Sequence, residues 1–312
     1  MAWLYPLLAG VVVLLATASG VQAQSNIVTS VKPIHSLVAG VMAGIGTPRL
    51  IVDGAGSPHT HSLRPTQARD IQNADVVFWV GHALEPFLEK PLTSLVKTAH
   101  VVELLETPGL THFSVRSGGA FDDHEHGNAG GHDDDHDEDG INPHIWLDPD
   151  NAQKMVETIG RTLMQADPAN AARYAINTGS LMRRLDALTR ELETVLAPAR
   201  GKPFVVFHDA YRYMEARFGL NAVGAIMVHP EVVPGVRQIS EIQARVRALK
   251  VGCVFTEPQF TPKLVAVVRE GTKANTAVLD PLGAGFKAGP DLYFEMMRAM
   301  ALTMRDCLGS GN

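Results

Sequence analysis

The sequence predicts an α/β fold with two lobes, each built on a parallel sheet, joined by a long rigid helix. Short runs rich in β-branched residues alternate with helical patterns in both halves of the chain, which is typical of parallel sheets. Between the halves, residues 169–197 contain no proline and a single glycine, Gly179, as a long uninterrupted helix requires. With 312 residues, 46% of them hydrophobic, the chain is long enough for one large domain or two of ordinary size.

The first half is expected to contribute four strands and three helices to one lobe. The strands are expected at residues 26–31, 49–53, 75–80 and 100–104. Between them, helical patterns cover residues 34–42, 66–72 and 84–95. The regular alternation decides these assignments, because each apolar run is too short to be assigned from its own periodicity.

A segment at residues 117–140 differs in composition from the rest of the chain. It holds nine Asp and Glu, four histidines and no Lys or Arg. Such a stretch cannot bury enough apolar surface to fold by itself, so a loop is expected. Imidazole and carboxylate groups are ordinary ligands of divalent cations, and a dense run of both predicts weak binding of several metal ions. A solubilising acidic linker is the alternative. The imidazoles concerned are those of His124, His126, His132 and His136.

The formal charge of -6 is produced by this acidic segment alone. Outside residues 117–140, 24 acidic side chains stand against 27 Lys and Arg, a net charge of about +3. These basic residues are scattered along the chain rather than gathered in a stripe, so no nucleic-acid partner is predicted.

A helix at about residues 149–164 and then the long joining helix are expected after the acidic segment. Asp167 as N-cap followed by Pro168 at the first helical position is a strong start signal. An apolar residue recurs every three or four positions over residues 181–195, so one face of the joining helix is expected to be buried. Pro198 is expected to end it.

The second half repeats the alternation and predicts a second lobe. Its strands are expected at residues 204–208, 222–227, 253–257 and 276–280. Its helices are expected at residues 211–218, 236–249, 262–270 and 291–308. The expected division of the chain is a first lobe at 24–166, a linker helix at 167–200 and a second lobe at 201–312.

The first 23 residues are predicted to be a cleaved signal peptide. They carry no charged side chain, and the apolar stretch ends in Val21-Gln22-Ala23, a small-x-Ala cleavage pattern. A membrane anchor is the alternative, but the stretch is short for a span and Pro6 interrupts it. No cysteine lies near the cleavage point, so a soluble periplasmic protein is expected rather than a lipoprotein.

The two cysteines, Cys253 and Cys307, both lie in the last quarter of the chain. In an oxidising compartment such a pair favours a disulfide over two free thiols. Zinc ligation by the pair is a further alternative, although no CxxC spacing is present. A disulfide closing this loop would stabilise the fold by roughly 4 kcal/mol in the chain-entropy model.

Four residues that can ligate a metal fall in loops or at the ends of predicted strands. Ligand sites of parallel sheets lie just beyond the carboxyl ends of the strands. Two candidates belong to the first lobe, His59 and His144, and two to the second, His208 and Asp280. Three imidazoles and one carboxylate form a tetrahedral set suited to zinc, whereas manganese prefers more oxygen ligands. Each residue alone could also be an ordinary hydrogen-bonded structural group.

Several stretches of the chain resemble a known family. They are Ser57-Pro-His-Thr-His-Ser-Leu-Arg-Pro-Thr, Ala74-Asp-Val-Val-Phe-Trp-Val-Gly, Asn142-Pro-His-Ile-Trp-Leu-Asp-Pro, Val206-Phe-His-Asp-Ala-Tyr, Phe255-Thr-Glu-Pro-Gln-Phe and Val278-Leu-Asp-Pro-Leu-Gly. In this order they resemble the periplasmic zinc-binding proteins of bacterial ABC uptake transporters. The manganese relatives have a Glu-centred motif in place of Phe-His-Asp-Ala, so the chain is similar to the zinc branch. The acidic His-rich loop and a cysteine pair in the second lobe are also typical of that branch.

The resemblance implies two α/β lobes with Zn²⁺ bound between them as transported ligand, and an ABC membrane permease as partner. It places the ligands at His59, His144 and His208, with Asp280 or a water as the fourth. His61 and Glu257 are candidates for contacts behind the ligands. The chain is expected to be monomeric and not an enzyme. A manganese-binding homologue, a secreted zinc hydrolase and a surface adhesin on the same scaffold remain alternatives.

Overall fold

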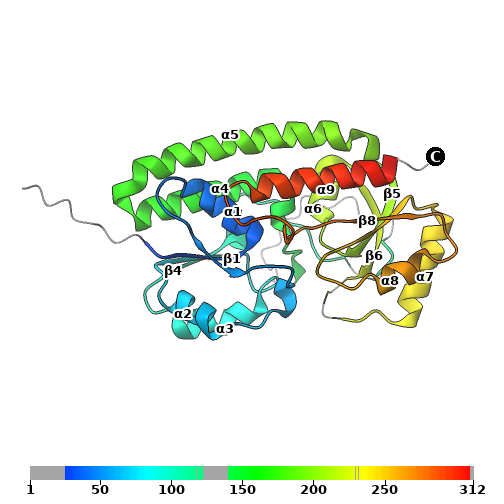
Figure 1. Cartoon of the computed structure of the whole chain (residues 1–312), viewed down its shortest axis with the longest axis horizontal. Coiled ribbons are helices and arrows are strands. Elements are labelled where there is room, and N and C mark those ends of the chain that lie inside the picture. Colours follow the sequence, from blue (N-terminus) through cyan, green and yellow to red (C-terminus); the bar gives the residue numbers. More distant parts are fainter. Residues whose placement is uncertain (1–24, 117, 122–139, 229, 231, 310–312) are drawn as a thin grey trace, which may run out of the picture.

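The computed structural model describes residues 25–116, 118–121, 140–228, 230 and 232–309. It contains two parallel four-stranded sheets, one in each lobe, and helix α5 (Ala171–Leu196) runs along both lobes (Figure 1). This arrangement confirms the predicted fold class. The predicted signal peptide at 1–23 lies outside the described residues, as do four histidines of the acidic segment: His124, His126, His132 and His136.

The first sheet has the strand order β2-β1-β3-β4. Its strands are β1 (Ile27–Val31), β2 (Arg49–Val52), β3 (Val76–Trp79) and β4 (His100–Glu103). Its helices are α1 (Lys32–Val41), α2 (Pro65–Gln72) and α3 (Pro86–Leu95). Helix α1 lies on one face of the sheet and α2 and α3 lie on the other (Figure 1). The inner strands β1 and β3 are therefore buried along their whole length, whereas the edge strand β2 begins exposed.

The second sheet has the corresponding order β6-β5-β7-β8. Its strands are β5 (Pro203–His208), β6 (Asn221–Met227), β7 (Cys253–Thr256) and β8 (Asn275–Val278). The helices of this lobe are α6 (Arg212–Phe218), α7 (Val236–Ala248) and α8 (Lys263–Arg269). In both sheets the chain first adds a strand on one side of the first strand and then continues on its other side. Each sheet therefore has a topological switch point, where ligands of such folds bind.

Two long helices, α5 and α9 (Leu292–Gly309), contact elements of both lobes. Helix α5 packs against α4 (Pro149–Ala166), α1 and α9. Its predicted apolar stripe is buried, with Leu181, Leu185, Leu188 and Leu192 all inside the core. The stripe is long enough to contact both lobes, so α5 and its neighbours form a common layer along one side of the molecule (Figure 1).

The start of the joining helix differs in detail from the prediction. Pro168–Asn170 form a turn of 3-10 helix, and α5 begins at Ala171. The Asp167 carboxylate does not cap backbone amides; it accepts hydrogen bonds from the side chains of Asn170 (2.7 Å) and Tyr174 (3.2 Å). The pattern predicted that this carboxylate would accept from backbone N–H groups of the helix. It accepts from these two side chains instead.

A disulfide links Cys253 to Cys307, with their Cα atoms 6.0 Å apart. It ties the first residue of β7 to the last turn of α9. The prediction of a disulfide is confirmed.

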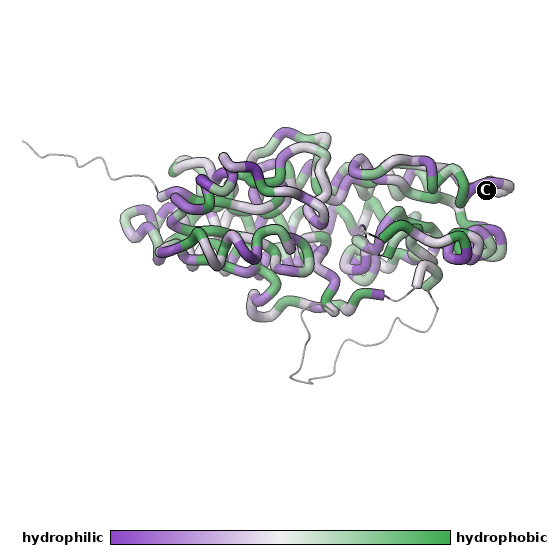
Figure 2. The backbone as a smooth tube through the Cα atoms, turned by 90° about the horizontal axis from the view of Figure 1, so that it is seen from below, coloured by the Kyte–Doolittle hydropathy of each residue, from purple (hydrophilic) through white to green (hydrophobic). Residues whose placement is uncertain are grey.

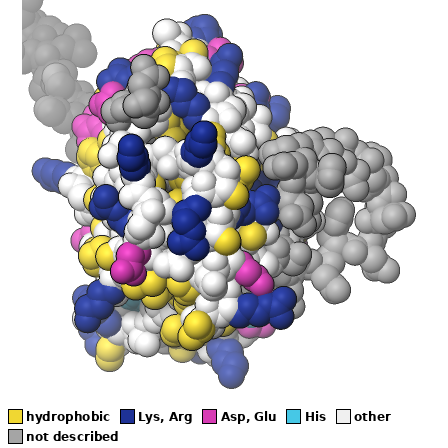
Figure 3. All heavy atoms as spheres, turned by 90° about the vertical axis from the view of Figure 1, so that its right-hand side faces the viewer, with side chains coloured by type: hydrophobic (Ala, Val, Ile, Leu, Met, Phe, Trp, Pro, Cys, Tyr) yellow, Lys and Arg dark blue, Asp and Glu magenta, His cyan; other side chains and the backbone are white. Residues whose placement is uncertain are grey.

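The surface agrees with the charge distribution of the sequence. Figure 2 shows the two lobes side by side from below, with hydrophobic stretches running through both. Over the end face of the second lobe, Lys and Arg stand singly between apolar and uncharged side chains, with few Asp or Glu (Figure 3).

Within the described part of the chain, no helix combines the length and the apolar character needed to span a membrane.

Candidate metal centre

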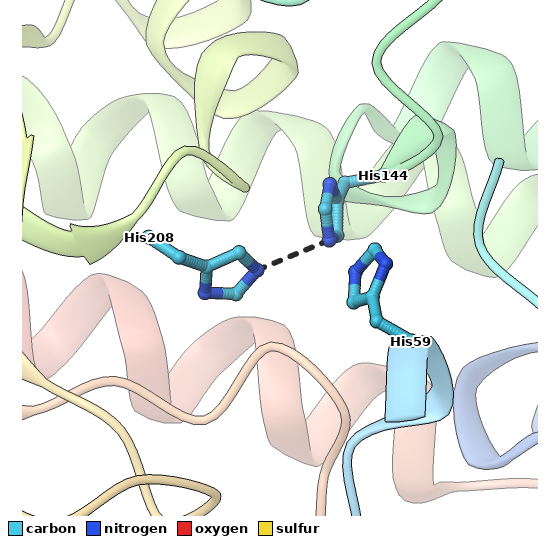
Figure 4. Close-up of side chains that lie close together, drawn as sticks. All are labelled: His59, His144 and His208. Carbon is cyan, nitrogen blue, oxygen red and sulfur yellow. Dashed lines mark hydrogen bonds between the residues drawn. The ribbon is translucent and has the colours of Figure 1, made fainter. Parts of the chain in front are cut away.

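Three imidazoles from distant parts of the chain converge between the lobes. Among the described residues, His59, His144 and His208 form the one group of three or more potential ligands, with ligand atoms within 4.8 Å of one another. Figure 4 shows the three rings pointing toward one another from three separate segments. The structure thus brings together three of the four predicted ligands.

His208 is the last residue of β5 and lies at the switch point of the second sheet. Glu257 directly follows β7, the neighbouring parallel strand, so both side chains leave the same edge of the sheet. The His208 Nδ1 atom lies 2.7 Å from Glu257 Oε1. Because a carboxylate only accepts, Nδ1 carries the hydrogen and Nε2 is turned toward the other two histidines.

His144 is held by two local hydrogen bonds to Asn142. It precedes the short 3-10 helix η4 (Ile145–Leu147) and is buried. The Asn142 side-chain oxygen accepts from the His144 backbone N–H (3.1 Å) and from its ring Nδ1 (2.9 Å). The fully buried Trp146 ring lies beside the His144 ring, with centroids 5.3 Å apart, and its Nε1 donates to the Pro281 carbonyl oxygen of the second lobe (2.9 Å). The ring is therefore oriented from its own loop and supported from the opposite lobe.

His59 comes from the loop after β2 and is the most accessible of the three. It is the middle residue of the short 3-10 helix η1 (Pro58–Thr60) and is half-buried, whereas His144 and His208 are buried. Its ring centroid lies 5.5 Å from that of His144 and 6.1 Å from that of His208. The buried Pro58 begins the turn and fixes its direction.

The spacing of the two buried rings suits a single cation. Their Nε2 atoms are 3.2 Å apart (dashed line in Figure 4). Two nitrogens bound to one tetrahedral zinc ion are separated by about 3.3 Å. With each Nδ1 donating elsewhere, the two Nε2 lone pairs face each other, and a shared cation satisfies both. The surrounding pocket offers about 10 Å³ to a water-sized particle, which is room for about one ion or water.

Burial lowers the pKa of His144 well below its ordinary value, and the neighbouring His208 and His59 lower it further. The ring is therefore neutral at neutral pH and its Nε2 lone pair is available to a metal. The remaining wall of the pocket is mostly apolar, with Pro58, Phe260, Pro281 and Leu282 around the imidazoles.

The other predicted residues lie outside this group of three. Asp280 is two residues beyond β8; its carboxylate accepts from the Gly285 backbone N–H (2.9 Å). Its role as a fourth ligand stays a prediction. The His61 ring packs against Phe87, with centroids 4.8 Å apart, and its Nε2 lies 3.3 Å from Gln67 Oε1.

Asn142 is a residue of the site that sequence reasoning did not single out. An Asn whose side chain bonds the backbone two residues ahead is a known local turn, so the Asn-Pro-His order carried a signal for it. The contact of the Phe260 ring with His208, at a centroid distance of 5.7 Å, had no such signal because it depends on the packing of two loops.

Comparison with known proteins points to one family. The family model described as zinc-uptake complex component A, periplasmic (ZnuA), matches residues 27–307. The high-affinity zinc uptake system protein ZnuA of Brucella abortus (strain 2308) is 45% identical over 316 residues, covering 91% of this chain and 92% of the relative.

Solved structures show the same fold. A crystal structure of ZnuA has a TM-score of 0.75 at 20% identity and covers 91% of this chain and 99% of that one. The SBP FpvC from Pseudomonas aeruginosa, solved in complex with Mn²⁺, has a TM-score of 0.76 at 22% identity, with 92% and 100% covered. A neighbour that holds manganese has this fold, so the fold alone does not select the metal.

Proposed function

Because the chain belongs to the family of periplasmic zinc-uptake components, we propose that it captures Zn²⁺ in the periplasm and delivers it to the permease of an ABC transporter. The observation that carries the proposal is the convergence of His59, His144 and His208 around a space with room for about one ion. These three are the proposed protein ligands, with Asp280 or a water completing a tetrahedral sphere.

The donor set favours zinc over manganese. Three imidazole nitrogens suit a borderline cation, whereas Mn²⁺ prefers oxygen ligands and has the lowest intrinsic affinity of the first-row divalent series. Glu257 and Asn142 support this set by holding the Nδ1 atoms of two ligands. Such partners increase the basicity of the ligand nitrogens and fix the rings in place.

The family to which the chain belongs favours a transport protein over a secreted zinc hydrolase. Hydrolysis needs an open metal position next to space for the scissile group. A pocket of about 320 Å³, lined in part by His59 and His144, lies beside the imidazoles, so the space at the site does not decide against hydrolysis and family membership carries the choice. We therefore assign the chain no catalytic role: it acts as a monomeric carrier whose signal peptide is removed after residue 23 on export.

The acidic segment serves in this proposal as a secondary, weaker zinc acceptor through His124, His126, His132 and His136. Its removal should abolish the weak binding of additional zinc ions and leave one tight zinc site. Residues 119–121 pair with β6, so the deletion is best confined to residues 122–139. Loss of the tight site in this deletion variant would contradict the division of roles.

The test is a zinc titration in competition with a chelator, monitored by calorimetry. It compares the mature protein with the variants His59→Ala, His144→Ala and His208→Ala. Each variant removes a proposed direct ligand. Loss of a residue that only hydrogen-bonds a ligand typically lowers metal affinity 10- to 100-fold, so loss of a ligand should lower zinc affinity roughly 100-fold or more. His61→Ala is the matched control and should bind as the wild type does.

The same titration with Mn²⁺ tests the choice of metal, and the wild type should bind manganese more weakly than zinc. Tight zinc binding by all three histidine variants would overturn the assignment of the site. Tighter binding of manganese than of zinc would overturn the assignment of the cargo.

A further inference from the structure

The chain crosses from the first lobe to the second at the start of the acidic segment, where it forms an isolated antiparallel bridge to the second sheet. Ala120 pairs antiparallel with Gly224 of β6, the edge strand. The Phe121 N–H donates to the Val223 carbonyl oxygen (3.1 Å), and the Ala225 N–H donates to that of Gly119 (2.8 Å). A second connection between the lobes thus exists beside the long helices.

Arg116 lies at the start of this crossing and joins two carboxylates of the second lobe. It is 6% exposed, and its guanidinium donates to both Asp209 and Glu215. Its Nε lies 3.1 Å from each Asp209 oxygen, and its Nη1 and Nη2 lie 3.0 and 2.8 Å from the two Glu215 oxygens. The Phe121 ring stacks on the guanidinium at 3.6 Å. Because the guanidinium makes two or more hydrogen bonds to each of two carboxylates, both the position and the plane of the Arg116 guanidinium are fixed.

Asp209 connects this cluster to two of the three proposed ligands. It directly follows His208 in the chain, so a shift of Asp209 moves the end of β5. Its backbone carbonyl accepts from the Asn142 side chain (2.7 Å), and Asn142 in turn accepts from His144 Nδ1 (2.9 Å). The path from Arg116 therefore branches at Asp209 and reaches one ligand from each lobe.

We propose that Arg116 is a positioning residue, which through Asp209 sets the spacing of His144 and His208 and so slows the loss of bound metal. This inference rests on the proposed function at the same site. Arg116 touches neither ligand, and its effect acts on the geometry of the rings. Preorganised ligands lose little freedom on binding and separate slowly, so the effect falls on dissociation more than on association.

Arg116 also neutralises a buried acidic pair. Asp209 and Glu215 are both buried, and burial raises the pKa of Glu215 while Arg116 opposes that rise. Removing the guanidinium alone leaves two buried carboxylates without their cation, which is strongly destabilising. A test therefore needs variants in which the acids are neutralised as well.

The experiment measures zinc release into excess chelator by stopped flow, on the mature protein and on Arg116→Met. The outer partners of metal ligands typically contribute 10- to 100-fold in affinity, so release should be about tenfold faster or more, with association little changed. The matched control is Arg217→Met. Arg217 also joins the lobes, from α6 to Asp148 and Asp150. Asp148 ends the 3-10 helix η4 that follows His144, but among the described residues neither carboxylate is hydrogen-bonded to a proposed ligand. The release rate of Arg217→Met should equal that of the wild type.

The triple variant Arg116→Met/Asp209→Asn/Glu215→Gln separates positioning from stability, because it removes the unpaired charges. Its melting temperature should return toward the wild-type value while zinc release stays fast. Wild-type release in Arg116→Met would overturn the inference. So would equally fast release in Arg217→Met, or a triple variant in which stability and slow release recover together. Absence of tight zinc binding in the wild type would instead overturn the proposed function.

Discussion

Each of the two buried imidazoles is held by one hydrogen bond at its Nδ1 atom, on the side away from the pocket. Glu257 accepts from His208, and Asn142 accepts from His144. These bonds select the tautomer with the hydrogen on Nδ1, which leaves the Nε2 lone pair available to a metal. They also fix the plane of each ring. At this scale the proposed site depends on the hydrogen-bond acceptors behind the imidazoles as much as on the imidazoles themselves.

Substitutions at Glu257 should separate the charge of this acceptor from its geometry. In Glu257→Gln the amide oxygen can still accept from His208 Nδ1, so zinc affinity should fall only a few-fold. In Glu257→Ala the ring loses its acceptor, and affinity should fall by about 10- to 100-fold. Competitive titration measures both. Equal affinity of the Ala variant and the wild type would show that Glu257 does not orient the ring.

Glu85 should make stability depend on pH independently of the metal site. It is fully buried, and its Oε2 accepts from the N–H groups of Val80 (3.1 Å) and Gly81 (3.0 Å). Burial raises its pKa from 4.5 to about 7, although Ser30 and these amides oppose the rise. The folded state thus holds a proton that the unfolded state has released, so this group's contribution to stability falls as pH rises from about 4.5 to about 7.

The measurement is urea unfolding of metal-free wild type and Glu85→Gln between pH 4.5 and 8. The stability of the wild type relative to the variant should fall by up to roughly 3 kcal/mol over this range and be constant above it. Parallel pH profiles for the two proteins would contradict the raised pKa of Glu85.

Helices α4 and α5 approach closely where glycine makes room. A Cβ atom on Gly160 of α4 would overlap the hydroxyl of Thr178 on α5, and its next neighbours would be Thr178 Cγ2 and Cβ. A β-branched side chain is stiff and cannot turn aside cheaply. On α5, directly after Thr178, a Cβ on Gly179 would meet only Arg183 Nη1, at 3.7 Å. The two glycines thus share a helical conformation and differ in their surroundings.

Alanine at these two positions should have opposite effects on stability. Both substitutions gain about 1 kcal/mol of helix propensity. In Gly160→Ala overpacking costs about 1–3 kcal/mol and the net effect is destabilising, whereas Gly179→Ala stabilises by up to about 1 kcal/mol. Thermal unfolding of the two variants checks the signs. A stabilising Gly160→Ala would mean that the contact between α4 and α5 is looser than described.

At the scale of the whole molecule, the disulfide and the metal site lie at opposite ends of one strand. Cys253 begins β7 and is bonded to Cys307 of α9, whereas Glu257 follows the other end of β7. The double variant Cys253→Ser/Cys307→Ser should lose up to roughly 4 kcal/mol of stability, because the unfolded chain is no longer closed over 54 residues.

Zinc affinity of the same variant should be unchanged at temperatures where it remains folded. Denaturant unfolding and zinc titration on one sample test both expectations. A large loss of zinc affinity would show that the disulfide also sets the position of Glu257.

Patterns local in the chain determined most of what was predictable. β7 was expected at residues 253–257 and occupies Cys253–Thr256, and the buried stripe of α5 follows the predicted leucines. Such elements follow from the period of apolar residues and from caps and turns, which involve neighbours a few positions apart. His59, His144 and His208 could be selected for the same reason, because the position of a residue after a strand or in a loop is readable from the sequence.

Contacts between distant residues were decided by the tertiary structure alone. The order β6-β5-β7-β8 places Glu257 beside His208, 49 positions away, and no local pattern specifies which strands are neighbours. Arg116 reaches Asp209 across 93 positions, and Gly119–Phe121 pairs with an edge that only the folded sheet presents. The chemistry of the three imidazoles was therefore present in the sequence, but their spacing and the groups that hold them depend on how the two lobes pack together.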